Sequence, residues 1–167
     1  MKKKVCIISI TLVVVLSAAF FTAAKLGLIF KSENRPVIET QTLKVFFNNN
    51  QLDPEYSCVK VFPVERELEK TKAPARKALE LLLLGPSEKE KQEGYMTTIS
   101  PNVKIQSLVI ENGMAKVDFD ETLEFQVGGS CRVSSIRAEI TQTLKQFATV
   151  DDVIISINGR TEDILQP

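Results

Sequence analysis

Residues 125–135, with the sequence FQVGGSCRVSS, combine the residue types that nucleophilic and anion-binding sites use. Cys131 stands directly before Arg132 at the expected start of a helix, where the helix dipole and the guanidinium both favour a reactive thiolate. The chain contains no histidine, however, so Cys131 has no imidazole that could accept its proton. We therefore do not expect cysteine-based catalysis.

The same stretch also has two glycines that could cradle a phosphate. Gly128 and Gly129 precede the expected helix, whose first backbone N–H groups can bind an anion. Their spacing differs from the phosphate-binding motif G-x-x-x-x-G-K-[ST]. The preceding segment contains Asp120, Glu121 and Glu124, and these carboxylates would repel a phosphate. Anion binding is therefore not expected here.

A tight entry into a helix is the remaining interpretation of this stretch. Glycines permit a sharp reversal of the chain, and Ser130 is placed to cap the first helical turn. An exposed loop of this kind can still contact a partner. We therefore name Gly128, Gly129, Ser130 and Arg132 as a candidate interaction loop.

Acidic residues elsewhere could in principle serve a metal ion or a hydrolase. Asp118 and Asp120 alternate along an expected strand and could hold a hard cation together with Glu121. Alternating acids on an exposed strand face are usually solvated, so no metal site is predicted. Carboxylate-based wall hydrolysis needs two carboxylates about 5–10 Å apart in a cleft, and no pattern predicts a cleft. The sequence thus predicts no catalytic residue, no cofactor and no enzyme.

Cys58 and Cys131 are the only cysteines outside the apolar N-terminal segment. Outside the cytoplasm, two such thiols can form a disulfide. The alternative is a pair of free thiols that are buried as small apolar residues. The sequence does not give the Cα separation that a disulfide requires, so both alternatives stay open here.

The charge of the chain is unevenly distributed. The whole sequence has 21 basic and 21 acidic residues, and five of the lysines precede residue 32. Residues 32–167 therefore carry 21 − 5 = 16 basic and 21 acidic groups, a net charge of −5. A mildly acidic domain without a basic stripe is a poor candidate for nucleic-acid binding.

Residues 5–24 form an uncharged run after the basic start MKKK. A helix of that length covers about 30 Å, the thickness of a bilayer core, whereas the apolar region of a cleaved signal is usually about 7–15 residues long. We therefore expect an uncleaved, single-pass membrane anchor, with a cleaved signal peptide as the alternative. Residues 1–4 should lie in the cytoplasm and the rest of the chain outside it. Residues 25–42 are interpreted as a linker.

Hydropathy alternates between period two and period 3.6 after this linker, which predicts strands and helices in turn. The predicted strands are LKVFFNN (43–49), CVKVFPVEREL (58–68), the two runs that flank Asn112–Gly113 in VKIQSLVIENGMAKVDFD (103–120), and DDVIISINGR (151–160). The predicted helices are APARKALELLLLGP (73–86) and RVSSIRAEITQTLKQFATV (132–150). One or two further helical turns are expected in SEKEKQEG (87–94), with Ser87 and Glu90 as a capping box and Gly94 as the stop. The order β-β-α-β-β-α-β predicts an α/β (α+β) two-layer sandwich, with both helices on one face of a single, mixed and mostly antiparallel sheet.

Residues from Leu43 to Arg160 resemble a GerMN domain, the sporulation and spore-germination module of exported bacterial proteins. The segments that carry the resemblance are LKVFF, VFPVEREL, ALELLLLGP, GYMTTIS, IENGMAKVDFDETL, GGSCRVSSIRAEITQTLKQF and VDDVIISINGR. The resemblance rests on the order and spacing of the whole series. Residues 161–167 are interpreted as a C-terminal tail. The chain differs from some members in having one copy of the domain and no lipobox.

This resemblance implies an extracytoplasmic, non-enzymatic domain linked to sporulation or germination. The implied fold is similar to ring-building modules, so the implied partners are envelope or sporulation-complex proteins and further copies of this chain. Arg66 matches a recurrent basic position of the family, which implies a structural role or a place in an interface. A peptidoglycan-binding module is the alternative function, although the chain has no tryptophan and only two tyrosines for stacking on sugars.

Overall fold

The computed structural model describes residues 38–166 of the chain. They belong to one compact unit, Ile38–Pro167. The predicted basic start (1–4), membrane anchor (5–24) and most of the predicted linker (25–42) lie outside the described residues. Within the described part, no helix combines the length and the apolar character that a membrane crossing requires.

Strands and helices follow one another in the predicted order, with two unpredicted short elements added. The strands are β1 (Thr40–Asn49), β2 (Phe62–Glu69), β3 (Tyr95–Met96), β4 (Ile105–Glu111), β5 (Met114–Phe119) and β6 (Asp152–Ile157). The helices are α2 (Pro74–Leu83), α3 (Glu88–Gln92), the 3-10 turn η1 (Glu121–Leu123) and α4 (Ser130–Lys145). The predicted α+β class is therefore confirmed, and so are the helical turn and capping box expected in residues 87–94, which form α3. β3 and η1 are additions to the predicted order.

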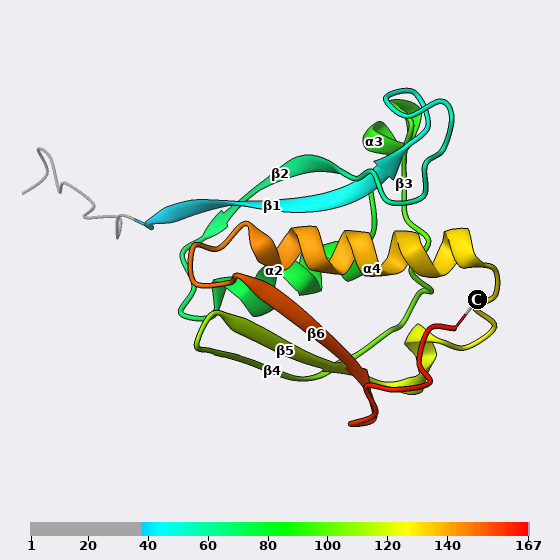
Figure 1. The fold of residues 1–167 in the computed structure, drawn as a ribbon. Coiled ribbons are helices and arrows are strands. Elements are labelled where there is room, and N and C mark those ends of the chain that lie inside the picture. Colours follow the sequence, from blue (N-terminus) through cyan, green and yellow to red (C-terminus); the bar gives the residue numbers. More distant parts are fainter. Residues whose placement is uncertain (1–37, 167) are drawn as a thin grey trace, which may run out of the picture. The chain divides into compact units, whose positions relative to one another are not determined.

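The strands form two three-stranded sheets and not the predicted single sheet. In the first sheet, β1 lies between β2 and β3 and is antiparallel to both. In the second sheet, β5 lies between an antiparallel β4 and a parallel β6. Figure 1 shows α2 and α4 between the two sheets, which makes three layers.

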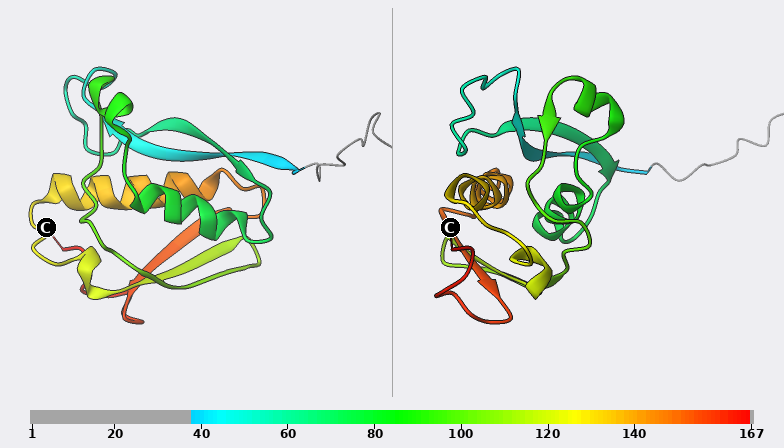
Figure 2. Two further views of the ribbon diagram at one scale, coloured as in Figure 1. Left: turned by 180° about the vertical axis from the view of Figure 1, so that it is seen from behind. Right: turned by 90° about the vertical axis from the view of Figure 1, so that its right-hand side faces the viewer.

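The prediction of two layers, with both helices on one face of one sheet, is therefore wrong. A period-two pattern shows which face of a strand is buried, but it does not show which strands pair with one another. Both helices contact β1 and α4 also contacts β6, so the helices are covered from two sides. Figure 2 shows the same layers from behind and from the side.

The apolar core lies on both sides of the helix layer. The predicted stripe of α4 is buried, and Phe147, which follows the helix, packs partly buried against the core. The residues of this stripe are Val133, Ile136, Ile140 and Leu144. The inward-facing residues of the strands complete the core, and they include Val45, Phe47, Ala115, Val117, Phe119, Ile155 and Ile157.

Local sequence signals for turns and helix ends are confirmed. Asn112 and Gly113 both have positive φ, 51° and 79°, as a type I′ hairpin turn requires. Gly113 is also tightly packed, because a Cβ atom at this position would lie 2.2 Å from Asp151 Oδ2. Helix α2 begins at Pro74, and Gly85 follows its end with a φ of +75°.

Two local predictions are wrong. β2 begins at Phe62, so Val59 lies in the preceding loop, where its side chain is 61% exposed. Ser130 does not cap α4, because the helix already begins at Ser130 and the residue before it, Gly129, has a φ of 88°.

The segment interpreted as a C-terminal tail, residues 161–167, contributes to the core through Ile164 and Leu165.

Candidate functional site

Helix α4 carries a buried polar stripe beside its apolar one. Ser135, Glu139 and Thr143 are spaced by four residues, so they lie on one face of the helix, and all three are fully buried. Gln146 continues this stripe at the helix end. Each of the four side chains binds a segment that is distant in the sequence, so α4 holds the loops of the domain in place.

The β1–β2 loop is attached to the first turns of α4 in two ways. Cys58 of the loop forms a disulfide with Cys131, and their Cα atoms are 5.1 Å apart. Ser135 Oγ donates a hydrogen bond to the carbonyl oxygen of Cys58 at 2.8 Å. Of the two alternatives that the sequence left open for these cysteines, the structure contains the disulfide.

Arg132 holds the segment that leads from β3 to β4. Its guanidinium donates to the carbonyl of Thr98 at 3.3 Å and to Ser100 Oγ at 3.2 Å. It also donates to the carbonyl of Gln126 at 3.0 Å. These bonds occupy the Arg132 side chain within the domain, and it is half-buried. The other members of the predicted interaction loop, Gly128, Gly129 and Ser130, are exposed.

Glu139 is a buried carboxylate at the centre of this arrangement. It accepts hydrogen bonds from Thr97 Oγ1 at 2.5 Å, from the backbone N–H of Thr98 at 3.1 Å and from Thr98 Oγ1 at 3.3 Å. Burial disfavours the ionised form and raises the pKa of Glu139 to about 7, although these hydrogen bonds act in the opposite direction. Sequence reasoning missed this residue; its signal was the spacing of Ser135, Glu139 and Thr143 beside the apolar stripe.

The far end of the polar stripe covers the part of the β1 edge that lies beyond its short pairing with β3. Thr143 Oγ1 accepts a hydrogen bond from the backbone N–H of Phe46 at 3.1 Å. Gln146 accepts from the N–H of Lys44 at 2.8 Å and donates to the carbonyl of Lys44 at 2.6 Å. Two side chains of a helix therefore satisfy backbone groups that would otherwise be open to another chain.

We expect Thr143→Val to lower the free energy of unfolding by about 1–2 kcal/mol. Valine has nearly the same shape but leaves the N–H of Phe46 without an acceptor. Urea unfolding followed by circular dichroism measures the difference. Thr141→Val, on the less buried side of the same helix, is the matched control and should change stability by less than about 0.5 kcal/mol. Equal effects of the two substitutions would show that Thr143 does not cap this edge.

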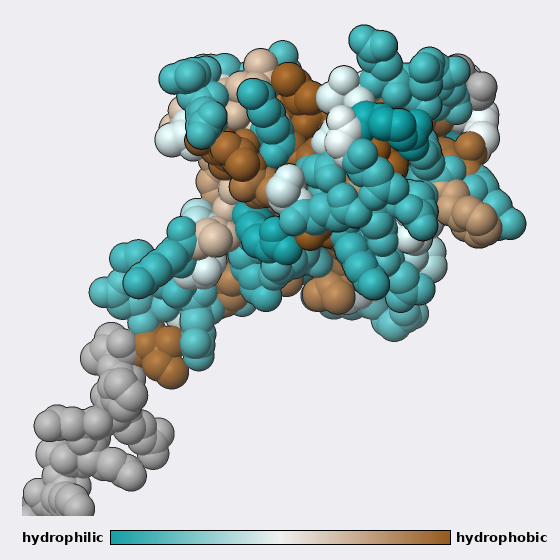
Figure 3. Space-filling view, turned by 90° about the horizontal axis from the view of Figure 1, so that it is seen from below, coloured by the Kyte–Doolittle hydropathy of each residue, from teal (hydrophilic) through white to brown (hydrophobic). Residues whose placement is uncertain are grey.

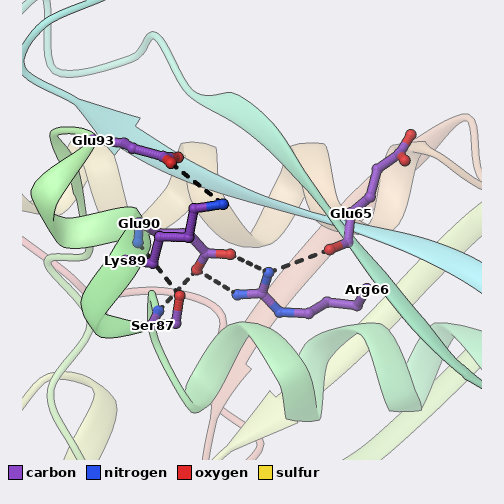
Figure 4. Close-up of polar contacts among 6 residues, drawn as sticks. All are labelled: Glu65, Arg66, Ser87, Lys89, Glu90 and Glu93. Atoms are coloured by element: carbon purple, nitrogen blue, oxygen red, sulfur yellow. Dashed lines mark hydrogen bonds and ion pairs between the residues drawn. The ribbon is translucent and has the colours of Figure 1, made fainter.

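Arg66 lies on β2 and points toward the short helix α3 (Figure 4). Its two terminal nitrogens contact the two carboxylate oxygens of Glu90 at 2.5 and 2.7 Å. Glu90 also accepts from the N–H of Ser87, whose side chain accepts from the N–H of Glu90 in a capping box. The Arg66 hydrogen bonds and the Ser87 N–H hold the pKa of Glu90 below its usual range.

We expect Arg66→Ala to destabilise the domain by about 2 kcal/mol, because the side chains of Arg66 and Glu90 are only 21% and 14% exposed. Lys70→Ala is the matched control, since Lys70 and Glu39 form an ion pair in which both side chains are more than 60% exposed. Its effect should stay below about 0.5 kcal/mol. Thermal unfolding of both variants decides between a structural role for Arg66 and a place in an exposed interface.

The acidic residues singled out in the sequence have separate partners. Asp118 accepts from Ser156 Oγ at 2.6 Å and from the N–H of Gly159 at 2.8 Å. Asp120 accepts from the N–H of Lys104 at 3.0 Å, and Glu121 accepts from Asn158 Nδ2 at 2.9 Å. Among residues 38–166, no group of three or more acidic or cysteine side chains is placed to bind a metal ion.

Several apolar side chains remain exposed on the surface. Phe125, just before the predicted interaction loop, is 64% exposed, and Val59 is close to that value. On the outer face of the second sheet, Val109 and Ile154 flank Lys116 in one cross-strand row. Figure 3 views the molecule from the side of this sheet, where hydrophilic residues dominate and hydrophobic residues form separate patches.

The sequence matches the Germane family, described as sporulation and spore germination, over residues 44–163. Among solved structures, the tandem GerMN domains of the sporulation protein GerM from Bacillus subtilis are similar, with a TM-score of 0.57 and 21% identity over 74% of this chain and 41% of that chain. The first GerMN domain of GerM from Bacillus subtilis gives a TM-score of 0.53 and 21% identity over 72% of this chain and 85% of that chain. These likenesses show a shared fold, and the chain spans less than half of the tandem-domain structure. No curated protein matches the chain.

Proposed function

The chain belongs to the Germane family of sporulation and spore germination, and we propose that it is a membrane-anchored, non-enzymatic interaction module of the bacterial envelope. Its proposed partners are envelope or sporulation-complex proteins. The observation that carries this proposal is the family match over residues 44–163. The fold shared with GerMN domains of a sporulation protein supports it.

The disulfide supports an extracytoplasmic location for the domain. Disulfides persist in oxidising compartments and are rare in the cytosol, and Cys58 and Cys131 are bonded in this structure. The uncharged run at residues 5–24 has the length that a bilayer crossing needs. We therefore place the N-terminus of the chain in the cytoplasm and the domain outside it.

A surface that is fixed before binding supports interaction as the mode of action. The disulfide, Arg132 and Glu139 attach two long loops to α4. Binding to a pre-ordered surface loses less conformational entropy than binding that must first order a loop. The exposed positions near these attachments, Phe125 and residues 128–130, are therefore proposed as contact positions.

Deletion of the gene in its host tests the link to sporulation or germination. We expect fewer heat-resistant spores or slower germination, and recovery when the full chain is supplied from a second locus. A chain that lacks residues 38–167 serves as the control and should not restore the phenotype. Normal spore yield and normal germination in the deletion strain would contradict the proposed function.

A further inference from the structure

One long side of β4 has no neighbouring strand among the described residues. The second sheet has the order β4-β5-β6, so β4 is an edge strand. In the first sheet, in contrast, β3 pairs with the end of β1 opposite β2, and Thr143 and Gln146 cover the rest of that edge. Figure 2 shows β4 at the rim of the second sheet, with α2 in the layer above it.

The inner face of β4 is only partly covered. Leu108 and Ile110 pair with the buried residues Val117 and Ala115 of β5, yet both are only half-buried themselves. They line a hollow of about 370 Å³, together with the first turn of α2 and Phe147. An apolar floor beside an edge strand is a surface that an added apolar side chain can fill.

A second hollow lies next to this one along α2. It has a volume of about 630 Å³ and is lined by Leu83, Leu84 and residues 101–105. Leu84 is 80% exposed, more than any other large apolar side chain of the described residues. Arg76 lines both hollows and donates a hydrogen bond to the carbonyl of Ile105 at 3.1 Å, so this side chain lies between the two neighbouring hollows. We call the pair of hollows the α2–β4 groove.

The free backbone N–H and C=O groups of β4 face the side on which a strand could be added. In β5, the carbonyl of Phe119 accepts from Asn158 on the β6 side, whereas the N–H of Asp120 donates to Lys104 on the β4 side. Alternation along the strand therefore directs the backbone of Lys116 toward its partner Val109 on β4. The N–H and C=O groups of Leu108 and Ile110 then face the open side. The two residues that floor the groove thus also present free backbone groups.

The charges around the groove indicate what it would bind. Lys72 lines the first hollow, Lys104 lines the second, and Arg76 lies between them. Glu80 is the single carboxylate among the lining residues, and it already forms ion pairs with Arg76 at 3.3 Å and Lys77 at 3.5 Å. The groove therefore complements an apolar segment that has a carboxylate at each end.

We propose that the α2–β4 groove binds an extended segment of a partner protein as an added strand along β4, with alternating apolar side chains in the groove and acidic residues at both ends. Its backbone would pair with Leu108 and Ile110, and its carboxylates would lie near Lys72 and Lys104. This inference deepens the proposed function and rests on it, since it names the kind of segment that the interaction module recognises.

Fluorescence anisotropy with the full chain in mild detergent tests this proposal. The probe is the labelled peptide DEVTITVED, and the comparison peptide is KKVTITVKK, which has the same apolar pattern and opposite end charges. We expect the acidic peptide to bind about tenfold more tightly than the basic one. Lys72 and Lys104 attract its terminal carboxylates, whereas they repel the terminal lysines of the comparison peptide. Added salt should reduce this difference, since the end charges are exposed.

A matched set of protein variants locates the binding. Lys72→Glu together with Lys104→Glu should lower the affinity for the acidic peptide by about tenfold. Lys116→Glu is the control, because it introduces one such charge reversal on the outer face of the same sheet, and it should leave binding unchanged. Circular dichroism of all variants checks that they fold. Two further peptides carry N-methyl groups at alternate residues, one at the odd and one at the even positions. The peptide whose methylated nitrogens face β4 should not bind, and the other should bind as before.

The proposal is overturned if the acidic peptide does not bind at about 100 μM, or if both peptides bind equally well. It is also overturned if the lysine substitutions have no effect, if N-methylation shows no period of two, or if sedimentation shows that a second copy of the chain occupies β4. Normal sporulation and germination in the deletion strain together with groove-dependent peptide binding would reject the proposed function alone. A deletion phenotype without peptide binding would reject only the proposed strand addition in the groove.

Discussion

Replacing both Cys58 and Cys131 with serine is expected to lower the free energy of unfolding of the domain by about 4 kcal/mol. The two residues are 73 positions apart, so their disulfide closes a long loop and strongly restricts the unfolded chain. The folded domain also loses the covalent attachment of the β1–β2 loop to α4. Urea unfolding at neutral pH, followed by circular dichroism, measures the change.

Reduction of the unaltered protein provides the matched comparison for this variant. The reduced protein and the double serine variant should unfold at the same urea concentration, because both lack the same bond. The hydrogen bond from Ser135 to the carbonyl of Cys58 stays in place in either case. An oxidised protein that is no more stable than the reduced one would contradict the role given to the disulfide.

Glu139 is expected to make the stability of the domain depend on pH. Its folded pKa of about 7 lies above the ordinary value of 4.5, so the folded state binds the proton more tightly than the unfolded chain. The resulting stabilisation is fully present below about pH 4.5 and is lost as the pH rises to about 7. It amounts to about 3 kcal/mol over this range.

Glu139→Gln isolates this effect from other titrating groups. Glutamine keeps one acceptor oxygen for the N–H of Thr98, and its NH2 group can donate to the hydroxyl oxygen of Thr97. It cannot ionise, so the variant should lack this loss of stability. Above pH 7 it should therefore be more stable than the unaltered protein. Glu55→Gln, at an exposed position, is the control and should leave the pH profile unchanged. Parallel pH profiles of the unaltered protein and the Glu139 variant would show that Glu139 does not titrate as its burial implies.

Local features of the fold were predictable because neighbouring residues determine them. The Asn112–Gly113 turn follows from the positive φ that its two residues tolerate, and the ends of α2 follow from Pro74 and Gly85. Strand pairing was not predictable in the same way. The patterns of β1 and β5 both predict a strand with one buried face, but nothing local assigns them to different sheets.

The polar attachments of α4 show where reasoning from single patterns fails. An amphipathic helix normally exposes its polar side, so Glu139 and Thr143 would be assigned to the surface. In this fold the helix layer is covered from two sides, and these residues instead satisfy backbone groups of other segments. The predicted start of β2 is wrong for a related reason. The disulfide at Cys58 holds the preceding loop on α4 and leaves Val59 outside the sheet.

Fewer residues of the candidate interaction loop are available for contacts than the sequence implied. Arg132 is bound to the segment around Thr98 and Ser100, so it helps to position the loop and is not free to meet a partner. Gly128, Gly129 and Ser130 remain exposed beside Phe125. The α2–β4 groove, which no sequence motif indicated, depends on two elements that only the fold brings together.

Site-specific photo-crosslinking in sporulating cells tests whether this protein acts through contacts with other proteins. A photoreactive benzoylphenylalanine is placed at Phe125 beside the loop, at Leu84 in the groove, and at Glu55 as an exposed control. We predict that mass spectrometry identifies a reproducible envelope or sporulation protein at Phe125 or Leu84 and none at Glu55. Capture of peptidoglycan fragments alone, or of no macromolecule at either position, would contradict a protein-interaction module.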